Sequence, residues 1–236
     1  MGITHDGWLT WAKRVPGPPE KVYSAVNKVE GYVPHSAVGY LPAWLRRLQS
    51  TERLPNGRYT PFAAASIHGW IPYGGEVLQH YSFLKSCWGS GSAYPNTHFV
   101  AFETEGGAPG NESEPLMEFQ LEMHARIIEE LAEWRGWKPR RPRGSSDTGA
   151  SLYEHRECRR WGSAATACPS GRMTALWVRL EDEMKEIENL KAALAFHGKI
   201  IVGNTAAINF LSKIAVNHEK RLVKLGSKPE DGEPDE

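Results

Sequence analysis

The feature that most constrains this chain is a change of sequence character near residue 172. Up to that point the chain is rich in Gly, Pro and Trp, and its apolar stretches are short and broken by turn residues. From Met173 onward Gly and Pro thin out, and apolar residues recur every seven positions. Short apolar stretches between turns are typical of strands, whereas a sustained seven-residue repeat is typical of coiled coils. The sequence therefore predicts a folded domain over 1–172, a helical segment over 173–226 and a disordered acidic tail over 227–236.

The pattern within residues 1–172 predicts an α/β domain, because strand signals alternate with helical ones. Leu116–Trp134 has its apolar residues on one helical face, which predicts a helix. The expected strands are Val26–Val33, Ala64–Ile71, Glu76–Tyr81 and Phe99–Glu105. The second and third of these are expected to pair across the turn Pro72–Gly75.

The seven-residue repeat has two interpretations. Its apolar positions are Leu180, Ile187, Leu194, Ile201, Ile208, Ala215 and Leu222, with Leu190, Leu211 and Leu225 three positions after members of this series. One interpretation is a coiled coil that makes the protein a homo-oligomer through residues 173–226. The other is a hairpin of two amphipathic helices with a break at Gly198–Gly203. We favour the oligomer as the expectation.

The overall composition argues against some classes of binding partner. Lys+Arg and Asp+Glu both number 28, so no net field would draw the chain to nucleic acid or to an anionic membrane. No apolar run approaches the roughly 18 residues of a membrane span, and Met1–Trp11 has no apolar core of a signal peptide. We therefore expect no nucleic-acid partner, no membrane insertion and synthesis in a cytoplasm. The three cysteines, an odd number, do not suggest a disulfide framework.

Three residues are candidate ligands for a metal ion. His35 follows the expected strand at 26–33, His155 lies in Tyr-Glu-His-Arg-Glu, and Cys168 lies in Thr-Ala-Cys-Pro-Ser-Gly. A catalytic zinc site uses three protein ligands and keeps one position open for water. None of the three is diagnostic alone, since the chain holds nine histidines and no dense metal motif.

The order of several short motifs adds a resemblance. These motifs are Gly7-Trp8-Leu9 with Ala12–Pro16, Val33–Ala37, Ser66–Ile71 with Gly75–Gln79, Cys87–Gly89 with Asn96, Phe102–Gly107, and His155–Glu157 with Cys168–Gly171. Together they resemble the type 2 N-acetylmuramoyl-L-alanine amidases, a family that includes peptidoglycan-recognition proteins and many phage endolysins. The resemblance covers residues 7 to about 172.

The resemblance implies a fold, a cofactor and a reaction. The fold is a mixed central sheet flanked by helices, with Zn²⁺ held in a groove by His35, His155 and Cys168. The reaction is hydrolysis of the amide bond between N-acetylmuramic acid and L-alanine in peptidoglycan. Zinc polarises the amide carbonyl and acidifies water, and Glu103 carries the proton to the leaving nitrogen. Whether Glu103 or Glu105 faces the groove is taken to depend on the phase of their strand.

Two positions depart from many members of the resembled family. Ile67 stands where many relatives have a catalytic Tyr, and this assigns the role of base to Glu103. Thr166 stands where others have Lys, and it can donate a hydrogen bond to the oxyanion without bringing a charge.

Further residues are expected to contact substrate. They are Trp70, Trp88, Tyr94 and Asn96. Aromatic faces pack well on sugars, although packing in the core is an equally good expectation for Trp70. His68 is expected to be a hydrogen-bonded hairpin residue and not a fourth ligand.

Four functions fit these expectations. The first is a phage endolysin, which accounts for the missing signal peptide and for the repeat at 173–226. The second is a cytoplasmic wall-recycling amidase acting on anhydromuropeptides, which the motif at residues 7–16 favours. The third is a non-catalytic peptidoglycan-binding module, but the retained Cys168 argues against it. The fourth is a scaffold in which the coiled coil is the functional part and the zinc is structural.

Overall fold

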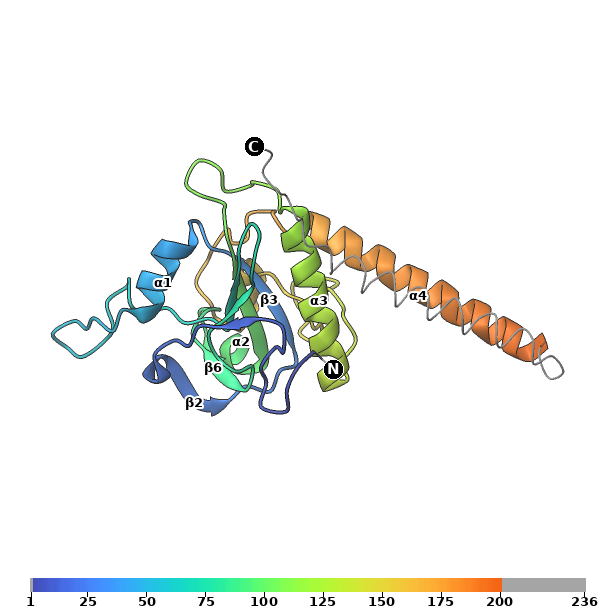
Figure 1. The fold of residues 1–236 in the computed structure, drawn as a ribbon, viewed down its shortest axis with the longest axis horizontal. Coiled ribbons are helices and arrows are strands. Elements are labelled where there is room, and N and C mark those ends of the chain that lie inside the picture. Colours follow the sequence, from blue (N-terminus) through green and yellow to red (C-terminus); the bar gives the residue numbers. More distant parts are fainter. Residues whose placement is uncertain (1, 201–236) are drawn as a thin grey trace, which may run out of the picture. The chain divides into compact units, whose positions relative to one another are not determined.

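The computed structural model describes residues 2–200 of the 236-residue chain (Figure 1). Residues up to Leu180 form one compact unit, and a second unit begins at Glu181. The later part of the predicted helical segment, residues 201–226, and all of the predicted tail at 227–236 lie outside the described residues.

The first unit is built on a mixed five-stranded sheet, in the order β1-β5-β4-β7-β3. The strands are β1 (Lys13–Arg14), β3 (Gly31–Ser36), β4 (Gly69–Ile71), β5 (Leu78–Gln79) and β7 (Phe99–Thr104). The pairs β3·β7, β4·β7 and β1·β5 are parallel, and β4·β5 is antiparallel. A separate antiparallel pair joins β2 (Val22–Val26) to β6 (Lys85–Cys87). The predicted mixed sheet is therefore confirmed.

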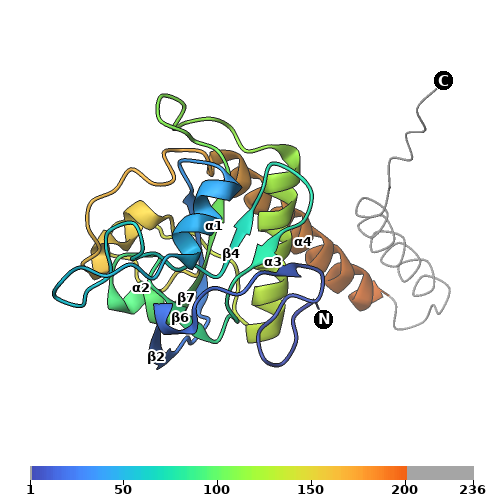
Figure 2. The same ribbon diagram turned by 60° about the vertical axis from the view of Figure 1, so that its left-hand side comes forward.

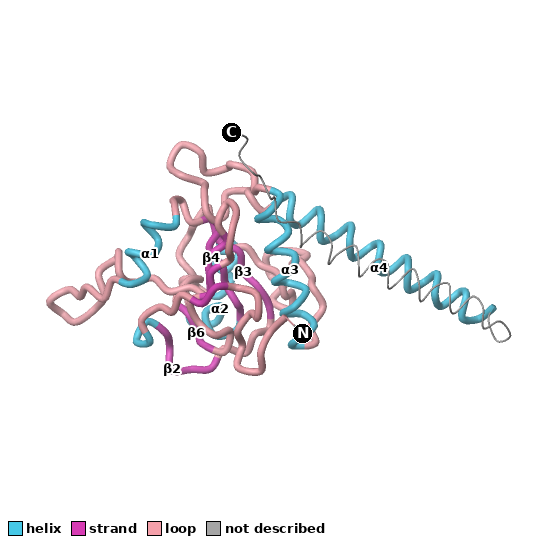
Figure 3. Tube along the Cα trace, viewed as in Figure 1, coloured by secondary structure: helices cyan, strands magenta, loops and turns pink. Residues whose placement is uncertain are grey.

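Helices lie on both faces of this sheet. The described helices are α1 (Leu41–Gln49), α2 (Ala93–His98), α3 (Glu118–Arg135) and α4 (Thr174–Ile200), with the 3-10 helices η1 (Pro19–Lys21) and η2 (His155–Trp161), and α4 continues from the first unit into the second. Figures 1 and 2 show α3 against one face and α1 on the other. Loops make up much of the rest, as Figure 3 shows.

Strand alternation divides the core into two clusters. Tyr32 and Phe102 face α3, while Val33 and Ala101 face α1 and η2. Burial of both faces explains why β3 and β7 are apolar along most of their length. The expectation for the helix at 116–134 is confirmed by α3.

One expected strand is divided in two. The segment Val26–Val33 was expected to be continuous, but β2 ends at Val26 and β3 begins at Gly31. Val29 between them has φ of 55°, a left-handed conformation that a β-branched residue rarely adopts, and its backbone N–H donates to the side chain of Asn27. As a result His35 lies within β3 and not after it.

Met173 and the first turns of α4 belong to the core of the first unit. Met173, Leu176 and Leu180 are buried in the cluster that α3 covers. The indole N–H of Trp177 donates to Oε1 of the buried Glu154 at 2.7 Å. The unit thus includes residues beyond the predicted boundary at 172.

Candidate active site and metal centre

The structure brings the three predicted ligands together. His35 comes from β3, His155 begins η2, and Cys168 lies in the turn before α4. Their potential ligand atoms all lie within 4.8 Å of one another. The imidazole centroids of His35 and His155 are 4.4 Å apart, and Sγ of Cys168 is 3.9 Å from Nδ1 of His35.

The protonation of this group suits a metal site. Burial lowers the pKa of His35, with a further contribution from His155, and burial also lowers the pKa of His155. Both imidazoles are therefore neutral near pH 7, which is the form that binds metals. Burial, followed by the charge of Glu103, raises the pKa of the Cys168 thiol to about 12. Two neutral imidazoles and a sulfur that would bind as thiolate are an ordinary donor set for zinc.

Neighbouring groups hold the three candidate ligands in place. The hydroxyl of Ser90 lies 3.5 Å from Nε2 of His35, on the other side of the ring from Cys168. The backbone N–H of Ser36 donates to Sγ of Cys168 at 3.3 Å. Thr166 accepts a hydrogen bond from the backbone N–H of Cys168 at 3.1 Å, so its side chain is tied to the ligand turn. Such outer contacts fix ligand orientation in metal sites.

Glu103 lies beside the ligands on the same face of the sheet. Its register partners are His35 on β3 and Trp70 on β4. Its Oε2 is buried and has no hydrogen-bond partner. Burial raises the pKa of Glu103 to about 7, against the opposing effect of Arg47 and Arg172. A partly buried carboxyl with a pKa near neutrality is suited to general acid–base chemistry.

The Glu105 side chain binds backbone groups of two loops. Its two carboxylate oxygens accept hydrogen bonds from the backbone N–H groups of Leu41 and Tyr73, at 3.0 and 3.1 Å. The expectation that strand phase would choose between Glu103 and Glu105 was wrong, because positions two apart face the same side. The difference arises because β7 ends at Thr104, so that Glu105 follows the strand and binds the adjoining loops.

The loop after β6 approaches the ligands and carries an aromatic cluster. A Cβ on Gly91 would lie 3.6 Å from Nε2 of His155. Trp88 in this loop is partly exposed and contacts Tyr23 and Tyr59, with ring centroids 6.3 and 5.3 Å away. Trp88 thus lies in the loop that reaches His155 through Gly91, and part of its surface is exposed.

The other expected substrate contacts occupy different positions. Trp70 is fully buried and stacked on Trp44. Of its two expected roles, it therefore packs in the core and does not line the groove. Asn96 is 4% exposed, and its Oδ1 accepts from the backbone N–H of Ser90, so it supports the loop from within. Tyr94 is half-buried and stacked on His98 and Trp161.

His68 takes the role expected of it. It bonds to the backbone carbonyl of Lys85 and accepts from the backbone N–H of Ala101. It is a hydrogen-bonded core residue.

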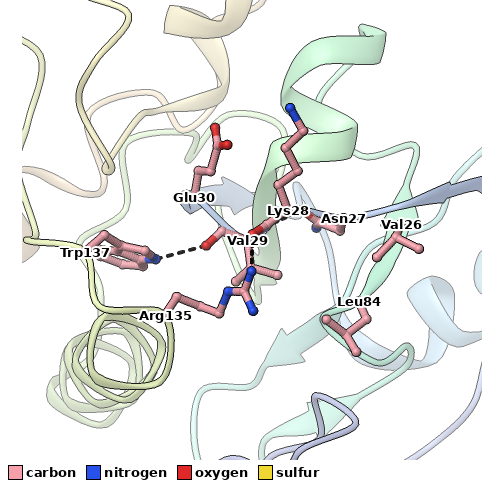
Figure 4. Close-up of a pocket in the computed structure, with 8 residues that line it drawn as sticks. All are labelled: Val26, Asn27, Lys28, Val29, Glu30, Leu84, Arg135 and Trp137. Atoms are coloured by element: carbon pink, nitrogen blue, oxygen red, sulfur yellow. Dashed lines mark hydrogen bonds between the residues drawn. The ribbon is translucent and has the colours of Figure 1, made fainter.

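A hollow in the surface lies away from this chemistry. It has a volume of about 650 Å³ and is lined by Val26, Asn27, Lys28, Val29, Glu30, Leu84, Arg135 and Trp137 (Figure 4). It adjoins the N-terminal end of β3, whereas His35 lies near the C-terminal end. Within its walls Arg135 and Trp137 donate to backbone carbonyls, and no cluster of reactive side chains is present.

One residue of the site was missed from the sequence. Arg172 is 2% exposed, and it bonds to the ends of the strands that carry His35 and Glu103. An arginine in a Gly- and Ser-rich turn gives no sequence signal of burial, because arginine is usually exposed.

Comparison with known proteins identifies the family. The model of the N-acetylmuramoyl-L-alanine amidase family matches residues 25–171, which is more than half of the chain. This chain belongs to the N-acetylmuramoyl-L-alanine amidase family. It is thus an amidase of peptidoglycan, and the expectation of an enzyme is confirmed.

Several solved structures are similar to this amidase. The endolysin LysCS from Clostridium intestinale URNW is 14% identical, with 74% of this chain and 98% of that chain covered and a TM-score of 0.48. AmpD is 20% identical, with 66% and 87% covered and a TM-score of 0.45. The catalytic domain of XlyA is 12% identical, with 71% and 95% covered and a TM-score of 0.48. No curated protein sequence matches the amidase.

Among residues 2–200, none of the helices combines the length and apolar character needed to cross a bilayer.

Proposed function

We propose that this amidase is zinc-dependent and cleaves the amide bond between N-acetylmuramic acid and L-alanine. The observation that carries the proposal is the convergence of His35, His155 and Cys168 beside Glu103. A zinc ion at such a site supplies Lewis acidity, which polarises a carbonyl and makes water a stronger acid. Three protein ligands leave one coordination position for the reaction.

The chain's own residues account for the proton transfers and the binding. Glu103 takes a proton from water and delivers it to the departing alanine nitrogen, since its pKa near 7 suits both steps. The Thr166 hydroxyl donates to the carbonyl oxygen as negative charge develops there. Trp88, with Tyr94 on the following helix α2, offers aromatic surface to the glycan.

A metal assay coupled to wall digestion tests this proposal. Purified protein should contain about one zinc per chain, lose activity on chelation and regain it with added zinc. Digestion of purified cell walls should release free amino groups on L-alanine. Activity that persists after complete removal of metal would overturn the zinc assignment and leave the family assignment intact.

We further propose that the biological role is that of a phage endolysin. The support is the seven-residue repeat at 173–226, because hydrolysis of small soluble fragments gives no reason for such a segment. Turnover of intact walls should therefore exceed turnover of soluble anhydromuropeptides. The opposite preference would indicate a wall-recycling enzyme.

The repeat is also the basis for an oligomer. On α4 the repeat positions Ile187, Leu190 and Leu194 are about half exposed, at 48%, 49% and 53%. Three apolar positions at coiled-coil spacing favour burial against another helix. We assign that helix to a second copy of the chain. Light scattering that finds a monomer would indicate instead that residues after 200 cover the same positions.

A further inference from the structure

Arg172 is a buried cation whose hydrogen bonds go to neutral acceptors. Its guanidinium donates to the carbonyl of Glu114 (2.8 Å), the hydroxyl of Ser36 (2.9 Å), the carbonyl of Thr104 (3.3 Å) and the carbonyl of Glu105 (2.8 Å). None of the ion pairs of the described residues includes it. The nearby Glu114 carboxylate opposes the lowering of the Arg172 pKa by burial, but that carboxylate accepts its hydrogen bonds from Tyr73 and Gly107. A buried charge that is not directly paired is costly, and a well-packed apolar side chain often gives more stability. Stability of the fold is therefore a weak reason for an arginine at this position.

The acceptors of Arg172 belong to the segments that carry the site. Ser36 directly follows the ligand His35 on β3, and Thr104 directly follows Glu103 on β7. Arg172 itself ends the turn that begins at Cys168, and its backbone N–H closes that turn on the carbonyl of Pro169 at 3.1 Å. One side chain thus joins the third ligand's turn to the strands of the first ligand and the proposed base.

Ser36 links the two halves of this arrangement. Its hydroxyl accepts from Arg172 at 2.9 Å, while its backbone N–H donates to Sγ of Cys168 at 3.3 Å. A shift of the guanidinium would therefore move a residue that contacts the ligand sulfur directly.

The surrounding backbone is shaped around the guanidinium. Gly106 and Gly107 have φ of 101° and 65°, the left-handed region that favours glycine. A Cβ on Gly106 would come within 2.7 Å of a terminal nitrogen of Arg172, and a Cβ on Gly107 would overlap the Ser36 hydroxyl. The two glycines allow the loop after β7 to close over the arginine.

We propose that Arg172 is a positioning residue of the metal centre, which clamps the Cys168 turn to the ends of β3 and β7 and thereby sets the affinity for the metal. This inference rests on the proposed zinc site. Guanidinium suits the role because its planar fork addresses several acceptors in fixed directions, whereas a lysine ammonium is a single point of donation.

The test is a measurement of zinc affinity by competition with a chromophoric chelator. Loss of an outer contact in a metal site typically weakens metal binding about 10- to 100-fold. We therefore expect Arg172→Met to raise the zinc dissociation constant by that factor, and Arg172→Lys to raise it less. Cobalt loading adds a second readout, since thiolate-to-cobalt absorption reports the Cys168 bond and should weaken in Arg172→Met.

Lys21 provides a matched control. It is also a fully buried cation whose ammonium donates only to carbonyls, those of Arg47, Leu48 and Ser50 at the end of α1. Lys21→Met should lower the stability of the fold but leave the zinc dissociation constant within about two-fold of the original, because none of its partners adjoins a ligand.

The possible results distinguish failure of the Arg172 proposal from failure of the proposed zinc site. An original protein that binds no zinc refutes the proposed zinc site itself. If that protein binds zinc and Arg172→Met binds it equally well, Arg172 is structural only and the inference is overturned. If Arg172→Met does not fold, Arg172→Lys decides, and unchanged zinc affinity in that variant overturns the inference, because one ammonium cannot replace all four contacts.

Discussion

Replacing Glu103 with Gln should lower the rate of catalysis and, in the metal-free protein, raise the stability of the fold. Gln nearly preserves size and shape but cannot accept a proton. General acid–base catalysis typically contributes about 10²–10⁴-fold. We therefore expect kcat to fall by that factor, which corresponds to roughly 3–5 kcal/mol of transition-state stabilisation, with zinc content and wall binding retained.

The same substitution should stabilise the metal-free protein. Burial raises the pKa of Glu103 from its ordinary 4.5 to about 7. At about 1.4 kcal/mol per pKa unit, holding this carboxylate ionised in the fold costs roughly 3 kcal/mol. A raised folded-state pKa means that the original protein loses stability as pH rises from 4.5 to about 7, and the loss is complete above that range. Because Gln does not ionise, the Glu103→Gln variant should not lose stability in this way as the pH rises.

Urea unfolding of the chelator-treated proteins at pH 4 and pH 8 measures the effect. The free energies of unfolding should nearly agree at pH 4, and the variant should be more stable at pH 8. If the original protein and the variant have the same free energy of unfolding at pH 8 as well as at pH 4, burial of the Glu103 carboxylate does not destabilise the fold, and this reasoning is refuted. Full turnover by the variant would refute the role of base.

Glu105→Gln is the matched control. Glu105 accepts two backbone N–H groups through different oxygens, and Gln can satisfy only one of them. The variant should lose about 1–3 kcal/mol of stability and keep its kcat. A large loss of kcat with intact stability would assign the base to Glu105.

Three further results are expected. His35→Ala, His155→Ala and Cys168→Ala should each lose zinc and wall digestion, and full zinc occupancy in all three by elemental analysis would contradict the ligand assignment. Mass spectra of digested walls should show free L-alanine amino groups and no new reducing sugar ends, whereas cut glycan strands would indicate a glycosidase. In light scattering the full chain should be an oligomer and a 1–180 protein a monomer, and a monomer in both would argue against the seam on α4.

The sequence predicted the elements whose signals are local. The helix at 116–134 and the strand at 99–105 were expected from periodicity and found as α3 and β7. The break between β2 and β3 was missed because Val29 is a typical strand residue by type. Its left-handed φ depends on neighbouring contacts that include the Asn27 side chain, and a propensity cannot show this.

Some residues of the candidate site could be predicted from the sequence and others could not. The three candidate ligands were singled out through the order of short motifs, since a spacing of more than a hundred residues between His35 and His155 carries no geometric signal, and the structure brings them together. Trp70 and Asn96 were expected to contact substrate, but residue type alone does not distinguish a groove wall from its buried support. Arg172 was missed because its acceptors are mostly backbone carbonyls, which no sequence pattern marks.

The anchoring of Trp177 on Glu154 limits where a new tail can be spliced onto this enzyme. Glu154 precedes His155, so the start of α4 helps to orient a residue next to a proposed ligand. A chimera joined where the family match ends, at residue 171, would ask the foreign tail to rebuild that contact and to refill the positions of Leu176 and Leu180. Exchange of tails, in evolution or in engineered amidases, should therefore succeed when the junction falls after Leu180 and fail when it falls at 171.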